Sequence, residues 1–74
     1  MAGWQKIADV LPDFDEVVLV ADSRYITDGG TPLARLNQRT WDRNIARTDN
    51  DFIDTGDGFH VDYWMPIPKI ENGR

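Results

Sequence analysis

A short β-branched run, Val-Val-Leu-Val-Ala at residues 17–21, is the clearest element in the hydrophobic pattern of the chain. Polar residues flank it, with Glu16 before and Asp22 after. An uninterrupted apolar run is typical of a central strand covered on both faces, and this run is too short for a buried helix. We therefore predict a central strand at residues 17–21.

Near the C-terminus, residues 59–65 alternate between apolar and polar positions. The alternation predicts a half-buried strand, and the prolines at positions 66 and 68 should end it because proline cannot donate to a ladder. One face would carry Phe59, Val61, Tyr63 and Met65, and the other His60, Asp62 and Trp64.

The N-terminal segment has a helical spacing. Its apolar residues Trp4, Ile7, Val10 and Leu11 fit one or two helical turns. Pro12 should end these turns, because the residue before a proline disfavours the α conformation.

The middle of the chain leaves two interpretations open. Residues 25–27 fit a second strand or a loop edge, and Asp28-Gly29-Gly30 predicts a turn. In residues 31–47, Thr-Pro at the start is typical of a helix N-terminus, and arginines recur every four residues. The alternative is a pair of short strands at residues 33–36 and 39–43.

These elements predict one domain over residues 1–74, of α+β or mainly β class. An N-terminal loop or helical turn would pack on a small antiparallel sheet of three to four strands, and residues 69–74 would form a frayed tail. The expected core is Trp4, Ile7, Leu11, Val18, Val20, Leu36, Trp41, Val61, Tyr63 and Trp64.

The amino-acid composition excludes several kinds of functional site and partner. The chain has no cysteine and one histidine, which excludes disulfide scaffolds, cysteine nucleophiles and cysteine-based zinc sites. Thirteen acidic residues against eight basic ones give a formal charge of −5, which argues against direct nucleic-acid binding. No apolar run approaches the roughly 20 residues that span a membrane, and no signal peptide is visible, so we expect a cytoplasmic protein.

An aspartate-rich loop is the nearest candidate for a metal site. Calcium favours acidic, glycine-punctuated loops, but Ile53 and His60 occupy positions where the EF-hand pattern needs ligands. We interpret the loop as a solvated acidic surface that could bind a partner protein. The alternative function is that of a small domain that binds a metal or another ligand through this loop. The residues of this predicted binding surface are Asp49, Asp51, Asp54 and Asp57.

A Ser/His/Asp triad would have to use Ser23 and His60, the only serine and the only histidine of the chain. A nucleophile and base need a third group that orients the base, and the sequence supplies no obvious one. We therefore predict that the protein is not an enzyme and that it carries no cofactor.

Several motifs along the chain share a family pattern: the opening Trp4-Gln5-Lys6-Ile7, then Asp9-Val10-Leu11-Pro12 and Val18-Leu19-Val20, the middle segments Leu33-Ala34-Arg35-Leu36 and Arg39-Thr40-Trp41, and the closing Trp64-Met65-Pro66-Ile67-Pro68. With these motifs the chain resembles, over nearly its whole length, a family of phage and prophage proteins known as domain of unknown function 551. The resemblance implies a phage or prophage origin and a small β-rich fold, and it favours strands over a helix in residues 31–47. It implies no activity, and Tyr63 stands where members often have a histidine.

The leading functional hypothesis is a small acidic interaction module that binds a host or phage protein with a basic surface. Inhibition of a host defence or nucleic-acid-binding protein by charge mimicry is its sharper form. A chain this short has a thin stability margin, so homodimerisation is a further possibility.

Overall fold

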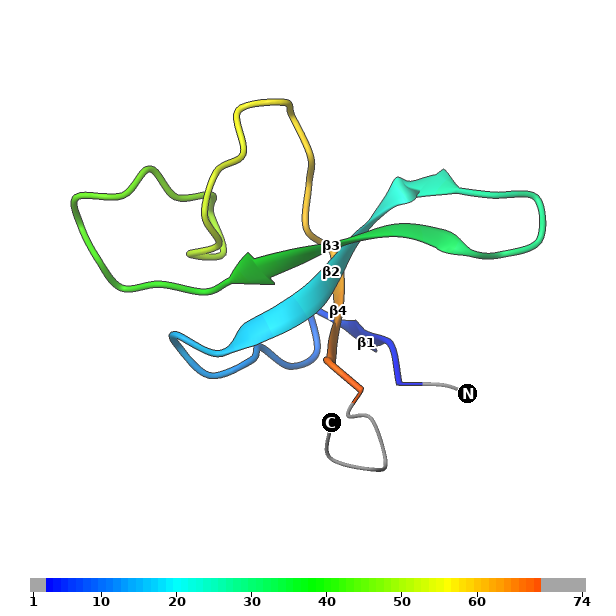
Figure 1. The fold of residues 1–74 in the computed structure, drawn as a ribbon, viewed down its shortest axis with the longest axis horizontal. Coiled ribbons are helices and arrows are strands. Elements are labelled where there is room, and N and C mark those ends of the chain that lie inside the picture. Colours follow the sequence, from blue (N-terminus) through cyan, green and yellow to red (C-terminus); the bar gives the residue numbers. More distant parts are fainter. Residues whose placement is uncertain (1–2, 69–74) are drawn as a thin grey trace.

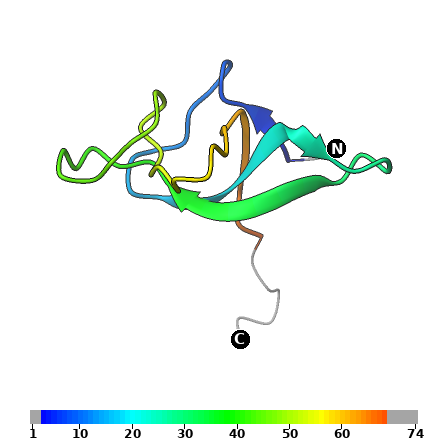
Figure 2. The same ribbon diagram turned by 90° about the horizontal axis from the view of Figure 1, so that it is seen from above.

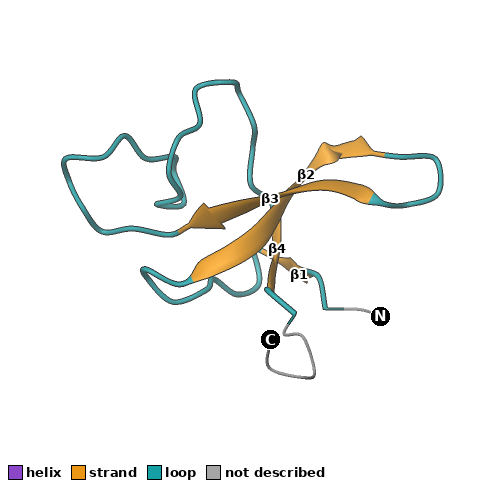
Figure 3. Cartoon of the chain, in the orientation of Figure 1, coloured by secondary structure: helices purple, strands orange, loops and turns teal. Residues whose placement is uncertain are grey.

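The computed structural model describes residues 3–68 as one open antiparallel sheet with no helix in that range (Figures 1 and 3). Its strands are β1 (Gln5–Lys6), β2 (Val17–Ile26), β3 (Pro32–Gln38) and β4 (Tyr63–Pro66), in the order β1-β4-β2-β3. The protein is thus mainly β, as expected. The tail predicted at residues 69–74 lies outside the described residues.

The predicted central strand is longer than expected. β2 continues through residues 25–26, so these residues extend the same strand and do not form a second one. A turn at residues 27–31 leads into β3, with Gly30 at φ 83° and its N–H donating to the carbonyl of Thr27 (2.8 Å). The turn predicted at Asp28-Gly29-Gly30 is confirmed.

Residues 31–47 contain a strand and no helix. β3 pairs with β2 from Val17 opposite Gln38 to Ala21 opposite Ala34. The second predicted strand, residues 39–43, is reduced to a single bridge between Arg39 and Phe52. The helix interpretation is wrong because the sheet pairing of β3 overrides the four-residue arginine repeat.

The last strand is shorter than its alternation predicts. β4 covers only residues 63–66. It ends at Pro66, which lies opposite Val18, so the prediction that the proline run ends this strand is confirmed. Trp64 pairs with Val20 and faces the core, whereas Tyr63 and Met65 lie on the other face. The predicted grouping of Tyr63 with Phe59 and Val61 is wrong because residues 59–62 are not in a regular strand.

The N-terminal segment forms a short strand and a turn, so the one or two helical turns predicted from its apolar spacing are wrong. β1 is followed by one hydrogen-bonded turn, in which the N–H groups of Asp9 and Val10 donate to the carbonyl of Lys6 (3.0 and 3.1 Å). The indole N–H of Trp64 donates to the carbonyl of Val10 (2.9 Å), which holds this loop against β4 and satisfies a buried polar group.

The core lies on one side of the sheet, where the loops before β2 and before β4 gather (Figure 2). Five of the predicted core residues are buried. Trp4 and Tyr63 are only half-buried, and Leu11, Leu36 and Trp41 are exposed. Phe52 and Phe59 fill the core in their place. The buried cluster is Ile7, Val18, Val20, Phe52, Phe59, Val61 and Trp64.

Candidate functional site

A bulge in β2 organises the polar residues of the sheet. Ala21 pairs with Ala34 and Ile26 pairs with Pro32, so an advance of five residues along β2 is matched by only two residues along β3. Such bulges redirect side chains locally. Here the bulge contains Asp22, Ser23 and Arg24, which make the most densely hydrogen-bonded group in the described chain.

Asp22 is a fully buried carboxylate at this bulge. The Arg24 guanidinium donates to it through Nε (3.0 Å), and the backbone N–H groups of His60 (2.8 Å) and Arg24 (2.9 Å) donate as well. These interactions hold the pKa of Asp22 well below its usual range, the Arg24 side chain contributing most, although burial alone would raise it. Asp22 therefore stays charged. Its hydrogen bond from the His60 N–H connects the segment before β4 to β2.

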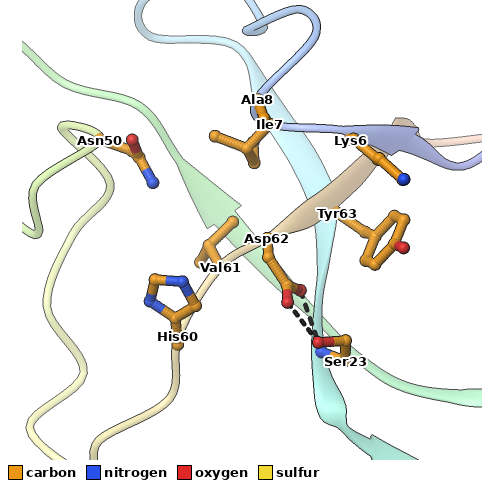
Figure 4. Close-up of a pocket in the computed structure, with 9 residues that line it drawn as sticks. All are labelled: Lys6, Ile7, Ala8, Ser23, Asn50, His60, Val61, Asp62 and Tyr63. Carbon is orange, nitrogen blue, oxygen red and sulfur yellow. Dashed lines mark hydrogen bonds between the residues drawn. The ribbon is translucent and has the colours of Figure 1, made fainter.

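A solvent-open groove of about 420 Å³ lies beside the bulge (Figure 4). Ser23 and His60 both line it, together with Lys6, Asp62 and Tyr63. Asp62 accepts hydrogen bonds from the backbone N–H of Ser23 (2.9 Å) and from its hydroxyl. In Figure 4 the carboxylate points at Ser23, and the imidazole of His60 lies to one side of this pair.

The groove does not have the geometry of a nucleophile–base pair. The hydroxyl of Ser23 has a single proton, and it donates that proton to Asp62. His60 therefore receives no proton from Ser23 in this arrangement, and the imidazole has no carboxylate within hydrogen-bonding distance to orient it among the described residues. The Ser23–Asp62 contact instead joins β2 to the chain entering β4.

The four aspartates of the predicted acidic surface do not converge. Asp51 lies 3.5 Å from both Arg39 and Arg47, and Asp57 lies 2.7 Å from Arg35. Asp54 accepts a hydrogen bond from the N–H of Gly56 (2.8 Å), which completes a local turn. In residues 3–68, no three histidine or carboxylate groups are placed to hold a metal ion, so the geometry gives the metal-binding alternative no support.

The opposite face of the sheet is largely uncovered. Leu19 of β2 pairs with Leu36 of β3 and with Met65 of β4, so these three side chains share one face, which we call the outer face. Val17 and Leu36 are 47% and 62% exposed on it. The prediction that residues 17–21 would be covered on both faces is wrong, because no loop in residues 3–68 folds over this side (Figure 2).

The outer face is apolar along much of its length. At the end of the face next to the turn between β2 and β3, a hollow of about 140 Å³ lies between Trp4, Ala21, Pro32 and Tyr63. The end of this face where β2 begins, at Val17, is called the near end. Trp41 follows β3 and is 65% exposed, and its indole N–H donates to the carboxylate of Asp15 (3.2 Å), two residues before Val17. Contiguous exposed apolar surface marks an interaction site more often than single exposed residues do.

Carboxylates without ion pairs border the near end of this face. Asp13, Asp15 and Glu16 are exposed, and no cation of residues 3–68 lies within 4.0 Å of any of them. Arg39 is close in the fold but is engaged elsewhere: its guanidinium lies 3.9 Å from the ring centroid of Phe14 and 3.5 Å from Asp51. The free negative charge thus lies beside exposed apolar side chains and not only in the loop at residues 49–57.

Two features of this arrangement differ from the sequence predictions. The sequence pattern predicts Asp22 only as a polar residue that flanks the central strand, although an aspartate two residues before an arginine at the end of an apolar run indicates a local ion pair. Hydrophobicity predicts Leu36 and Trp41 in the core, but both are exposed. The acidic run at residues 13–16 beside Val17 was the signal that this end of the sheet faces solvent.

Comparison with protein-family models, curated proteins and solved structures finds no match to this chain. The family resemblance therefore rests on the sequence motifs quoted above. In residues 3–68, no helix has the length and apolar character needed to cross a membrane.

Proposed function

We propose that this chain is a small, non-enzymatic interaction module, encoded by a phage or prophage, that acts in the host cytoplasm on a protein with a basic surface. The observation that carries the proposal is the uncovered outer face, where Val17 and Leu36 are exposed. The exposed Trp41 is hydrogen-bonded to Asp15 close to the start of β2, and Asp13, Asp15 and Glu16 form no ion pair within residues 3–68. Apolar surface supplies affinity on desolvation, and the carboxylates steer and orient a cationic partner. The phage origin is supported by the motifs at the two ends of the chain.

Charge is distributed in a way that suits this role. Among residues 3–68, four ion-pair contacts involve only three aspartates, Asp22, Asp51 and Asp57. Most acidic side chains of this range therefore form no ion pair within it. An acidic surface of this kind can compete with a nucleic acid for a basic groove, which is the basis for proposing inhibition of a host defence or nucleic-acid-binding protein.

The full chain, coupled to beads and incubated with bacterial lysate, tests this function. We expect it to retain a protein with a basic surface that is released as the salt concentration rises, because salt screens exposed charge pairs. The released protein should lose nucleic-acid binding when the chain is added back. Retention of no protein, or of proteins whose release does not depend on salt, would contradict the proposal.

A further inference from the structure

At the near end of the outer face two large apolar side chains are exposed, and a third, Trp41, is hydrogen-bonded to Asp15 close to the start of β2. Val17 begins β2 and Leu36 lies near the end of β3, and the register places both on the outer face beside Leu19. Leu36 and Trp41 are among the most exposed large apolar residues of the described chain, at 62% and 65%. We call Val17, Leu36 and Trp41 the apolar patch.

Trp41 is held in position before any partner binds. Its indole N–H donates to Asp15 Oδ2 (3.2 Å), and the Asp15 carbonyl accepts a hydrogen bond from the Gln38 side chain (2.7 Å). The N–H of Asp15 donates to the carbonyl of Arg39 (2.5 Å). A tryptophan held only through its indole N–H keeps both faces of its ring available for contact with a partner. Because the side chain is already ordered, less conformational entropy is lost when the partner binds.

The negative charge beside the apolar patch favours a partner with positive charge. Asp13, Asp15 and Glu16 precede Val17 directly in the chain and have no ion pair with a cation of residues 3–68. The partner that complements this surface carries apolar side chains to cover Leu36 and Trp41, flanked by lysine or arginine to meet the carboxylates.

A second copy of the chain is a poorer fit. A twofold dimer through this patch would bring identical surfaces together, so the two sets of carboxylates at residues 13–16 would face the same region of the interface. Like charges across an interface disfavour association, and the whole chain already carries a formal charge of −5.

We infer that the apolar patch with Asp13, Asp15 and Glu16 is the docking site for a cationic amphipathic segment of the partner protein. This inference rests on the proposed function and gives it a location and a ligand chemistry. It assigns recognition to the near end of the outer face, with the loop at residues 49–57 outside the contact.

Titration of the full chain with a synthetic leucine–lysine amphipathic peptide, followed by tryptophan fluorescence, tests the site. We expect saturable binding that weakens about 10-fold in Leu36→Ser and in Trp41→Ala, as for truncation of central contacts. Leu33→Ser is the matched control, because Leu33 is also exposed on β3 but faces the opposite side of the sheet. It should bind within about twofold of the parent chain.

A second pair of variants tests the charge. Asp13→Asn with Glu16→Gln should weaken binding and reduce its salt dependence, whereas Asp49→Asn with Asp54→Asn should leave both unchanged. A leucine–glutamate peptide should not bind. Equal loss in Leu33→Ser and Leu36→Ser, or loss confined to the pair at residues 49 and 54, would overturn the location.

Two further outcomes separate the inference from the proposed function. If Leu36→Ser and Trp41→Ala capture a host protein as well as the parent chain does, the docking site is wrong while the function stands. If sedimentation shows a dimer that Leu36→Ser converts to a monomer, the occupant of the patch is a second copy and the inference fails.

Discussion

The carboxylate of Asp22 accepts a hydrogen bond from the backbone N–H of His60, with 2.8 Å between Oδ2 and the amide nitrogen. The two residues are 38 positions apart, so one buried side chain joins β2 to the segment that enters β4. The same carboxylate binds Arg24, whose Nη2 also donates to the carbonyl of Gly58 (2.7 Å). The long connection before β4 is fastened to the sheet at this point.

Asp22→Asn should destabilise the protein by about 2–4 kcal/mol, because the amide cannot replace the charge-assisted bonds of a buried carboxylate. Urea denaturation followed by tryptophan fluorescence measures the change. The exposed Asp49 provides the control, since Asp49→Asn should stay within about 0.5 kcal/mol of the parent. Equal stability of the two variants would show that the Asp22 contacts contribute nothing net.

Stability should fall in acid. The pKa of Asp22 is lowered by Arg24 and by backbone N–H groups, and that of Asp57 is lowered by Arg35, Thr55 and Phe59. A depressed pKa in the folded state means that the unfolded chain takes up protons first, so this contribution is present above about pH 4 and is lost as the pH falls below it.

The urea midpoint measured between neutral pH and pH 3 checks this dependence. Asp22→Asn should flatten the acid decline strongly, and Asp57→Asn should flatten it less because the Asp57–Arg35 pair is exposed to solvent and screened. If the urea midpoint of Asp22→Asn fell with pH as steeply as that of the parent chain, the loss of stability in acid would come from other carboxylates.

The turn at Gly58 should be sensitive to substitution for conformational reasons alone. Gly58 has φ +79°, and a Cβ there would contact nothing within 4 Å, so strain is the only expected penalty. Gly58→Ala should therefore cost about 1–2 kcal/mol. Gly29 has equally open surroundings without a positive φ, and Gly29→Ala should be neutral or slightly stabilising. Thermal unfolding of the two variants makes the comparison.

Core and outer face should respond differently to truncation. Phe52 is fully buried, and Phe52→Ala should cost about 3–5 kcal/mol, which is comparable to the whole stability expected of so short a chain. Near-ultraviolet circular dichroism should show that variant largely unfolded. Leu36→Ala should change stability by no more than about 0.5 kcal/mol. A large loss in Leu36→Ala would mean that the outer face is covered in solution.

The sequence predicted the parts of the fold that depend on local pattern. The run at residues 17–21, the turn at Asp28-Gly29-Gly30 and the mainly β class follow from β-branched residues, glycine and proline, whose preferences act locally. The burial of Ile7, Val18 and Val20 follows from their hydrophobicity. Each of these predictions is confirmed in the structure.

The missed features depend on contacts distant in sequence. Leu36 and Phe52 are both large and apolar, but only the sheet order and the path of the loops decide that one is exposed and the other buried. The pairing of Asp22 with His60 depends on a bulge that no local pattern indicates. The irregular conformation of residues 59–62 likewise reverses the faces that a regular alternation predicts.

We propose that the chain recognises a cationic amphipathic partner through the near end of the outer face. The most direct measurement is a nuclear magnetic resonance titration of the isotopically labelled full chain with the leucine–lysine peptide. We expect chemical-shift changes concentrated at Val17, Leu19, Leu36 and the indole N–H of Trp41. Shifts confined to residues 49–57, or to the groove lined by Ser23 and His60, would contradict it.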